Sequence, residues 1–267
     1  MTRNYYHYED EMMRKKTEEH FTADSWSYTE DGYLMFSGIG TLDEMYVMTL
    51  SDVKEYAALR VEPLDEACRE WNEKALLPVG YECNNLFLTD WDETDFGELD
   101  FYDLFDVFYP QIYHRKIPWQ SGKNAGNSIA YGIPSKEFES VIQKFLNVKT
   151  DILREKTIYR EKDDTYEYYP RGFYESEYPE HPYPEVTAFQ ENDDGTVTLT
   201  VHAVFPYLGS SRALVHEVTV RPMENAAAAV QYVSNKIVSS LDDPDDNWYV
   251  PRLSGEERSL LYEENTD

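Results

Sequence analysis

The amino-terminal third of the chain alternates between apolar and polar positions, as paired β-strands do. Trp26 and Tyr28 precede a Glu-Asp-Gly triplet at residues 30–32, and the alternation resumes at Tyr33 and Met35. Asp-Gly between two alternating runs predicts a β-hairpin, because glycine accepts the positive φ of a tight turn. We expect the antiparallel meander to continue through two further strands, residues 45–50 and 56–61.

A helical pattern follows the first meander. Pro63 suits the first turn of a helix, where the missing N–H costs nothing, and two acidic residues favour the positive helix end. The apolar face consists of Leu64, Cys68, Trp71 and Ala75. The sequence therefore predicts a helix over residues 63–77.

Two more helices are expected in the middle of the chain. Ser135 is the expected cap of a helix, because an apolar stripe at helical spacing follows it: Phe138, Val141, Ile142 and Phe145. A shorter helix is predicted over residues 151–156.

The last third predicts a second antiparallel meander. Its strands are expected at residues 186–190, 197–204, 214–221 and 231–238, with an Asp-Gly turn near residue 194. Val197, Leu199 and Val201 share one face, and Thr198, Thr200 and His202 share the other, which indicates a sheet with one solvated side. His216 shares its face with apolar neighbours and is expected to be a half-buried, hydrogen-bonded histidine. His202 is expected to pair with Glu217 across the sheet.

Together these elements predict an α+β fold with two antiparallel β-meanders, about three packed helices and an acidic C-terminal tail. The expected segments are a charged stretch at 1–24, a meander with its helix at 25–80, helices and the second meander at 81–241, and a solvated acidic tail at 242–267. Whether the two central segments share one core is left open.

Composition restricts the partners. The chain has 267 residues and a net charge of −28, with a pI of about 4.4. Such a polyanion repels phosphate backbones, so nucleic acid is not expected as a partner. The sequence has no apolar run of ~20 residues and no apolar signal-peptide core near its start. Taken as a whole protein, it would be cytoplasmic; a fragment of an exported protein would look the same.

The two cysteines, Cys68 and Cys83, do not decide the redox compartment. Cys68 lies on an apolar helix face, which favours a buried thiol, while a Cys68–Cys83 disulfide remains the alternative. Cysteine and histidine spacing typical of a zinc site is not found.

Residues 84–109 carry eight carboxylates and eight aromatic rings without a basic residue. Phe101, Leu104, Phe105 and Phe108 predict a helix whose cap is Asp95, with Glu98 completing a capping box. Asp103 and Asp106 are then expected to face water.

A cation site is the alternative, functional interpretation of the same residues. Asp90, Asp92 and Asp95 would supply oxygen ligands to Ca²⁺, the one cofactor that the sequence suggests. An EF-hand is excluded, because its glycine and glutamate positions hold Asp95 and Phe101. Asp90 or Asp92 would also serve a hydrolase that uses a pair of carboxylates.

The segment at residues 161–185 is rich in tyrosine and proline and is expected to form a long irregular loop. Tyrosine offers a wide ring and a hydroxyl group at low entropic cost, which suits glycan or peptide recognition. The candidate ligand-binding residues are Tyr166, Tyr168, Tyr174, Tyr178 and Tyr183. The alternative is that these rings pack into the domain. No catalytic residue is assigned.

Five segments together resemble an uncharacterised family of extracytoplasmic, often lipid-anchored proteins of Gram-positive bacteria, described as a domain of unknown function. The segments are LRVEPLDEACREWNEKALLPVGYECNNL (59–86), TDWDETDFGELDFYDLFD (89–106), GIPSKEFESVIQKFLNVKTDILRE (132–155), EVTAFQENDDGTVTLTVHAV (185–204) and HEVTVRPMENAAAAVQYVSNKI (216–237). The resemblance implies that this chain is the C-terminal portion of a longer precursor with a signal and a lipid-attachment cysteine.

These observations favour a non-enzymatic binding or interaction module of the bacterial cell envelope. The expected partner is a glycan, a peptide or another envelope protein, and membrane contact is expected only through an anchor outside this chain. A carboxylate-pair hydrolase and a cation-stabilised structural domain are the alternatives.

Overall fold

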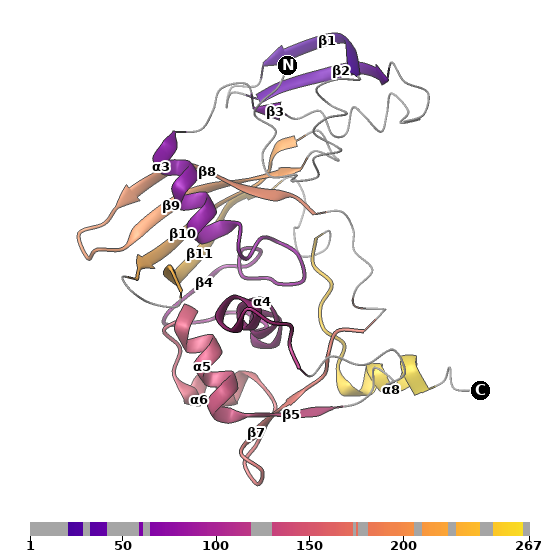
Figure 1. The fold of residues 1–267 in the computed structure, drawn as a ribbon, viewed down its shortest axis with the longest axis vertical. Helices are drawn as coiled ribbons and strands as arrows, with labels where there is room; N and C mark the ends of the chain where they lie inside the picture. The colour runs from indigo at the N-terminus through magenta and orange to yellow at the C-terminus, as the bar shows by residue number, and fades with distance from the viewer. Residues whose placement is uncertain are drawn as a thin grey trace.

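The structure is a computed structural model of the chain. It describes residues 21–28, 33–41, 59–60, 65–118, 130–172, 175, 181–205, 210–223, 228–240 and 248–263. In this part of the chain the fold is α+β with antiparallel sheets, as the sequence predicts. Figure 1 shows the largest sheet above the central helix α4 (Phe101–Tyr113), with helices α5 (Ser135–Phe145) and α6 (Thr150–Lys156) and a small sheet below it.

The largest sheet has five antiparallel strands in the order β4-β11-β10-β9-β8. Its strands are β4 (Trp91–Asp92), β8 (Tyr183–Glu191), β9 (Val197–Phe205), β10 (Ser210–Pro222) and β11 (Val230–Ser240). The four long strands pair with their neighbours in sequence, which confirms the predicted second meander. The short strand β4 was not predicted. It pairs with the outer edge of β11.

Alternation along β9 places its apolar side chains in the core. Val197, Leu199 and Val201 are buried, while Thr198 and Thr200 are only half-buried. The predicted solvated side of the strand ends after Thr200, because His202 is also buried. The expected pairing of His202 with Glu217 is wrong: His202 lies opposite Val215 and Glu185, and Glu217 lies opposite Thr200.

His216 is a fully buried histidine with both ring nitrogens hydrogen-bonded. Asn235 donates its amide N–H to the Thr89 carbonyl, so its oxygen accepts a hydrogen bond from His216 Nδ1, at 2.7 Å. Nε2 therefore accepts from the Tyr81 hydroxyl, at 2.8 Å. Burial lowers the pKa of His216 to about 4, so the ring is neutral near pH 7. The prediction of a satisfied histidine is confirmed, although the residue is more deeply buried than expected.

A second sheet contains the predicted hairpin. Strand β1 (Phe21–Tyr28) pairs with β2 (Tyr33–Thr41), and β2 pairs with β3 (Leu59–Arg60). Tyr28 lies opposite Leu34, and the Asp-Gly pair at residues 31–32 lies outside the described residues. The strand predicted at residues 45–50 lies outside the described residues.

The third sheet corrects the prediction of a long irregular loop. Its strands are β5 (Tyr131–Pro134), β6 (Tyr159–Arg160) and β7 (Thr165–Tyr168), in the order β5-β7-β6. Strand β7 reads Thr-Tyr-Glu-Tyr and buries both tyrosines. This alternation covers only four residues, and the prolines that follow it obscured the pattern.

The predicted helix after the first sheet is present. Helix α3 (Glu66–Trp71) continues as the π-helix η2 (Asn72–Leu76). Its cap is Asp65, whose carboxylate accepts a hydrogen bond from the Ala67 N–H. Asn72 fixes this helix against the sheet, because its side-chain oxygen accepts a hydrogen bond from the backbone N–H of Val186 on edge strand β8.

The cap of helix α4 (Phe101–Tyr113) lies five residues after the predicted cap. Asp100 is the cap, and its carboxylate accepts hydrogen bonds from the N–H groups of Tyr102 and Asp103. The assignment of Asp95 as the cap is wrong, because its side chain accepts from the Gly97 N–H in the preceding turn. The local sequence offers two aspartates, Asp95 and Asp100, that could each cap this helix.

Two helices below α4 and one near the C-terminus complete the described helices. They are α5 (Ser135–Phe145), α6 (Thr150–Lys156) and α8 (Gly255–Glu263). Ser135 is the first residue of α5 and not its cap: no side chain caps α5, and the Ser135 N–H donates to the Asp164 carbonyl.

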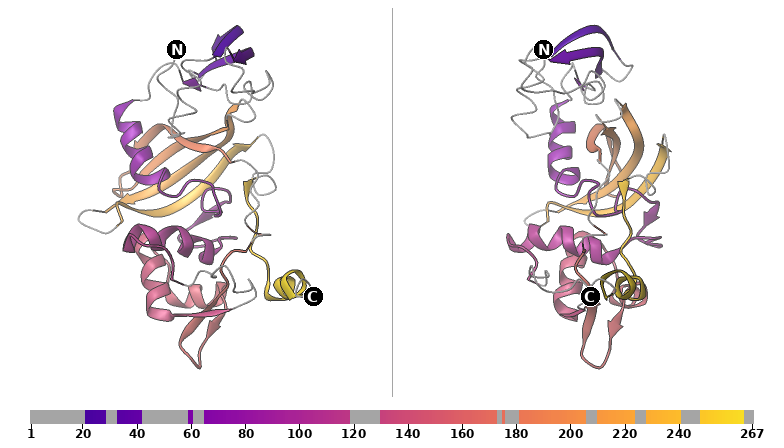
Figure 2. Two further views of the ribbon diagram at one scale, coloured as in Figure 1. Left: turned by 45° about the vertical axis from the view of Figure 1, so that its right-hand side comes forward. Right: turned by 90° about the vertical axis from the view of Figure 1, so that its right-hand side faces the viewer.

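The core joins α4 to the large sheet on one side and to α5 on the other. The Phe108 ring stacks on Phe145 of α5 at a centroid distance of 4.0 Å and lies parallel to Tyr232 of β11 at 6.2 Å. The Tyr232 hydroxyl donates to the Ala75 carbonyl. Residues from both predicted central segments therefore share one core cluster. Figure 2 shows α4 between these layers in two further views.

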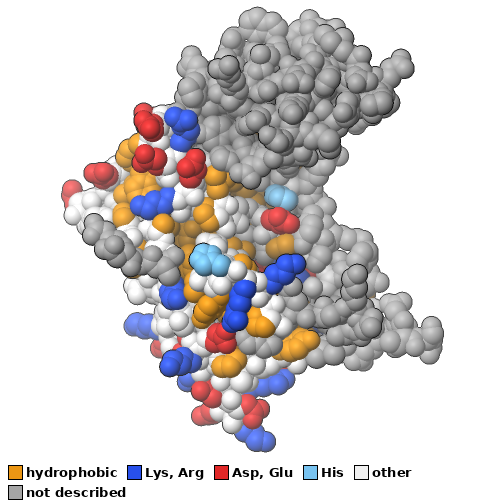
Figure 3. Space-filling model, in the orientation of Figure 1, with side chains coloured by type: hydrophobic (Ala, Val, Ile, Leu, Met, Phe, Trp, Pro, Cys, Tyr) orange, Lys and Arg blue, Asp and Glu red, His pale blue; other side chains and the backbone are white. Residues whose placement is uncertain are grey.

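No disulfide joins Cys68 and Cys83; Cys68 is buried and Cys83 half-buried, so the expected buried Cys68 thiol is confirmed. On the face drawn in Figure 3, acidic and basic side chains alternate with hydrophobic ones over the described part of the chain. Among the residues that the structure describes, none of the helices combines the length and apolar character that crossing a membrane requires.

The turn before α4 requires a glycine at residue 97. Gly97 has a φ of +50°, and a Cβ atom there would lie 2.7 Å from the Asp90 carbonyl oxygen. Gly80 has a similar φ of +61°, but a Cβ atom there would meet no atom within 4 Å. Both glycines therefore have a backbone conformation that would strain an alanine. Only at Gly97 would the added Cβ atom also meet a close neighbour.

We expect Gly97→Ala to destabilise the protein by about 3 kcal/mol, because an overpacking cost adds to the left-handed backbone strain. Gly80→Ala is the matched control and is expected to cost about 1 kcal/mol, from backbone strain alone. Urea unfolding followed by circular dichroism measures both. Equal losses in the two variants would contradict the close contact at Asp90.

Candidate functional site

The described tyrosines of the candidate binding segment are buried. Tyr166 and Tyr168 lie on β7, and Tyr183 lies on β8. The Tyr166 ring stacks on Phe138 at 4.5 Å, and its hydroxyl donates to Glu139. These rings fill the interior, so a ligand could stack on them only after they were uncovered. Tyr174 and Tyr178 lie outside the described residues, and their role stays a prediction.

Each of the three aspartates of the expected cation site accepts hydrogen bonds from backbone N–H groups. The Asp92 carboxylate accepts from the backbone N–H groups of Thr94 and Asp95, and Asp95 accepts from Gly97. Asp90 points elsewhere and accepts from the Ile237 N–H of β11. The described residues contain no group of three or more His, Cys, Asp or Glu side chains that could hold a metal ion. The geometry therefore gives no support to the calcium interpretation.

The C-terminal segment packs against the domain, which corrects the prediction of a solvated tail. Trp248, Tyr249 and Arg258 are buried, and the segment passes beside α4 before it forms α8 (Figure 1). Trp248 packs edge-on against Tyr81 and Phe205, at 6.1 and 5.6 Å. The nine carboxylates of residues 242–267 suggested solvent exposure, but the aromatic and arginine side chains of this segment determine how it packs.

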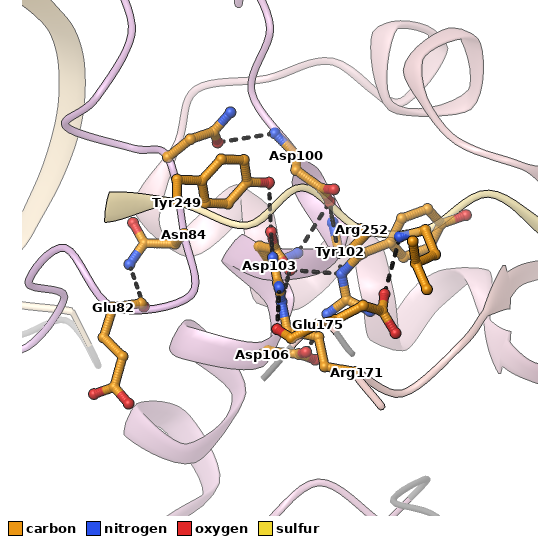
Figure 4. Close-up of polar contacts among 12 residues, drawn as sticks. Glu82, Asn84, Asp100, Tyr102, Asp103, Asp106, Arg171, Glu175, Tyr249 and Arg252 are labelled. Atoms are coloured by element: carbon orange, nitrogen blue, oxygen red, sulfur yellow. Dashed lines mark hydrogen bonds and ion pairs between the residues drawn. The ribbon is translucent and has the colours of Figure 1, made fainter. Parts of the chain in front are cut away.

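Asp103 of α4 is the centre of the contact between this segment and the domain. Its side chain is 0% exposed. Arg171 donates to both carboxylate oxygens, at 2.8 and 2.6 Å, and Arg252 donates to Oδ1 at 2.5 Å. The Tyr249 hydroxyl donates to Oδ2 at 2.7 Å. Figure 4 shows these side chains converging on the amino-terminal half of α4.

Asp106, one turn further along α4, extends the same cluster. Its Oδ1 accepts from the Tyr168 hydroxyl at 2.7 Å, and its Oδ2 accepts from Arg252. Arg252 also donates to the Tyr169 carbonyl, at 2.5 Å. The expectation that Asp103 faces water is therefore wrong, and Asp106 is half-buried rather than exposed. Because one arginine bridges both carboxylates and the backbone after β7, it joins three parts of the chain.

Glu175 forms a second buried ion pair with Arg258. Its Oε2 accepts from the Gly172 N–H, and its Oε1 accepts from the Leu253 N–H and from Arg258. Arg258 also donates to the Pro170 carbonyl, at 3.0 Å. We call the contacts of Asp103, Asp106 and Glu175 with Arg171, Arg252 and Arg258 the arginine clamp.

The electrostatics of the clamp follow from burial. Burial, followed by the charge of Asp103, raises the pKa of Asp100 to about 6. Burial also raises the pKa of Asp106, although Arg252 opposes the shift. The surrounding carboxylates hold the pKa of Arg252 well above its usual value despite the cost of burial. A buried carboxylate that lost these arginines would be strongly destabilised.

The hydrogen bonds of the clamp account for its carboxylates as structural groups. Both oxygens of Asp103 and of Asp106 already accept hydrogen bonds from the protein. Asp103 and Arg252 are separated by 149 residues, so no local pattern could have paired them. The one available signal was composition: Arg252 and Arg258 are the two basic residues among nine carboxylates in residues 242–267.

The carboxyl end of α4 borders a hollow of about 460 Å³. Its described lining consists of Asp106, Pro110, His114, Arg115, Lys116 and Ile117. Asp106 thus belongs both to the clamp and to the wall of the hollow. The helix ends at His114, whose left-handed backbone (φ 50°) turns the following residues towards the hollow. No sequence pattern marks these residues as a site, because basic side chains after a helix commonly just complement its negative end.

Comparison with known proteins identified one family. Residues 1–252 match the model of a family of unknown function (DUF6070). No curated protein and no solved structure matches the chain. The family match agrees with the resemblance to an uncharacterised family. The organisms, the lipid anchor and the extracytoplasmic location that the resemblance implies stay predictions.

We expect Asp103→Asn to destabilise the protein by about 3–5 kcal/mol, because it leaves two buried guanidinium groups without their shared carboxylate. Asp163→Asn is the matched control. Asp163 is exposed in the turn between β6 and β7, and its substitution is expected to change stability by no more than about 0.5 kcal/mol. Chemical unfolding at pH 7.5 compares the two variants with the wild type. Equal stability of Asp103→Asn and the wild type would contradict the central role of Asp103.

Proposed function

We propose that this chain, which belongs to the DUF6070 family of unknown function, is a non-enzymatic binding module whose ligand occupies the hollow at the carboxyl end of α4. We also propose that it acts in the bacterial cell envelope. The binding proposal rests on the hollow and on the side chains that line it. The envelope location rests on the resemblance of the five sequence segments alone.

The observation that carries the proposal is the presence of available polar groups in a hollow of suitable size. Small-ligand sites usually measure about 300–1,000 Å³ and combine apolar walls with a few polar groups. The hollow, at about 460 Å³, has Pro110 and Ile117 as apolar lining. His114 and Lys116 are exposed, and neither side chain has a hydrogen-bond or ion-pair partner among the described residues.

The remaining lining is held in place. Arg115 donates to the Tyr109 hydroxyl at 2.8 Å and lies over the Tyr109 and Tyr113 rings. Asp106 is fixed by Tyr168 and Arg252. A site whose supporting side chains are already positioned loses less conformational entropy when it binds. The clamp therefore prepares one wall of the proposed site.

The other two hypotheses find less support in the geometry. Asp90 and Asp92 accept hydrogen bonds from backbone N–H groups, which gives no reason to assign either one to a hydrolase. The hydrolase and the cation-stabilised domain stay predictions. Chromogenic glycosides and esters test the first, and thermal unfolding with calcium or a chelator tests the second.

A glycan array and a peptide array, followed by titration calorimetry with the full chain, test the binding proposal. We expect at least one member to bind and Lys116→Ala to weaken that binding about tenfold, as for the loss of a charged hydrogen bond. Lys162→Ala is the matched control, since Lys162 is an exposed lysine in the β6–β7 turn. Binding should stay within about twofold in that variant. The absence of binding in both arrays, or equal binding by both variants, would contradict the proposal.

A further inference from the structure

We propose that the hollow recognises the free carboxylate at the end of a peptide whose last residue is aliphatic. This inference rests on the proposed function and specifies the ligand class of the same site. It follows from the charge of the lining residues, from the hydrogen-bond partners that each charged side chain already has, and from the apolar surface beside them.

The residues that line the hollow are mostly basic, whereas the chain as a whole is strongly acidic. The whole chain carries a net charge of −28, yet positions 114–116 read His-Arg-Lys, and all three residues line the hollow. Asp106 is the one acidic residue in the described lining, and both its oxygens accept hydrogen bonds, from Tyr168 and Arg252. A carboxylate whose charge is compensated by an arginine opposes an incoming anion less than a free one.

The negative end of α4 is also partly compensated. A helix end exposes carbonyl groups that disfavour anions. Here one of these carbonyls, that of Pro110, accepts from the His114 N–H. Of the three basic residues, Arg115 is engaged with Tyr109, whereas Lys116 has no hydrogen-bond or ion-pair partner in the described part of the chain. Lys116 is therefore the residue best placed to donate to a ligand oxygen.

The single positive charge of Lys116 favours a ligand with one negative charge. One available lysine matches a single carboxylate, and a charge-assisted hydrogen bond of this kind is about twice as strong as a neutral one. The −28 net charge of the chain repels polyanions, so phosphate-rich or highly sulfated ligands gain less than a singly charged group does.

The apolar lining favours a peptide end over an acidic sugar. Pro110 and Ile117 border the hollow; Ile117 is only 6% exposed, so the apolar surface open to a ligand belongs mainly to Pro110, which is half-buried. An aliphatic side chain next to a terminal carboxylate would cover this surface and remove it from water. A uronic acid carries hydroxyl groups on most of its ring carbons, and these would lose hydrogen bonds with water against the same surface.

The test uses the full chain and an array of hexapeptides with random sequences, each made with a free and with an amidated carboxyl terminus. Oligosaccharides that contain uronic acid, with their neutral counterparts, form the second arm. Titration calorimetry then measures the best free-acid peptide and its amide. We expect the free acid with an aliphatic last residue to bind at least tenfold more tightly than the amide.

Three variants separate the role of charge from that of structure. Lys116→Gln should remove the preference for the free acid, Lys116→Arg should keep it, and Lys162→Gln should leave it unchanged. Circular dichroism confirms that each variant is folded. Loss of the preference in Lys116→Gln and its retention in Lys116→Arg would support a direct carboxylate contact.

The contrary outcomes are distinct. A peptide that binds equally as acid and amide would overturn the carboxylate inference and leave the proposed function standing. Tighter binding of the uronic acid oligosaccharides than of any peptide would overturn the peptide assignment. An array in which no peptide and no sugar binds would overturn both the inference and the proposed function.

Discussion

The buried carboxylate of Asp103 is the constraint on which the described structure most depends. A carboxylate that is removed from water costs several kcal/mol unless cationic and hydrogen-bonding partners surround it. Here Arg171 comes from the segment after β7, and Arg252 and Tyr249 come from the C-terminal segment. Because one side chain on α4 needs all three, it brings two distant parts of the chain onto the same helix.

Helix α4 consequently has two chemically different ends. Its amino-terminal half meets the arginine clamp, and its carboxyl end borders the hollow with basic lining. Asp106 links the two, since it accepts from Arg252 and also lines the hollow. The rings of Phe105 and Phe108 hold the helix between α5 and the large sheet. The proposed binding site is therefore built on a helix that the clamp and the aromatic core hold in place.

The sequence predicted the parts of the fold that follow from local periodicity. Alternation along Val197, Leu199 and Val201 predicted β9, and the stripe from Phe138 to Phe145 predicted α5. Local patterns failed where two residues compete for one role, as Asp95 and Asp100 did for the cap of α4. They also failed for the clamp, because ion pairs across 68 to 149 residues leave no periodic signal. The hollow could not be predicted, since a shape is a property of the packed elements.

Hydrogen exchange followed by mass spectrometry tests the central claim most directly, in the wild type and in Asp103→Asn. If Asp103 holds the C-terminal segment, backbone amides of residues 248–258 will exchange at least about tenfold faster in the variant, while those of β9 and β10 stay protected. Unchanged protection of residues 248–258 in a variant that lacks the carboxylate would contradict the account.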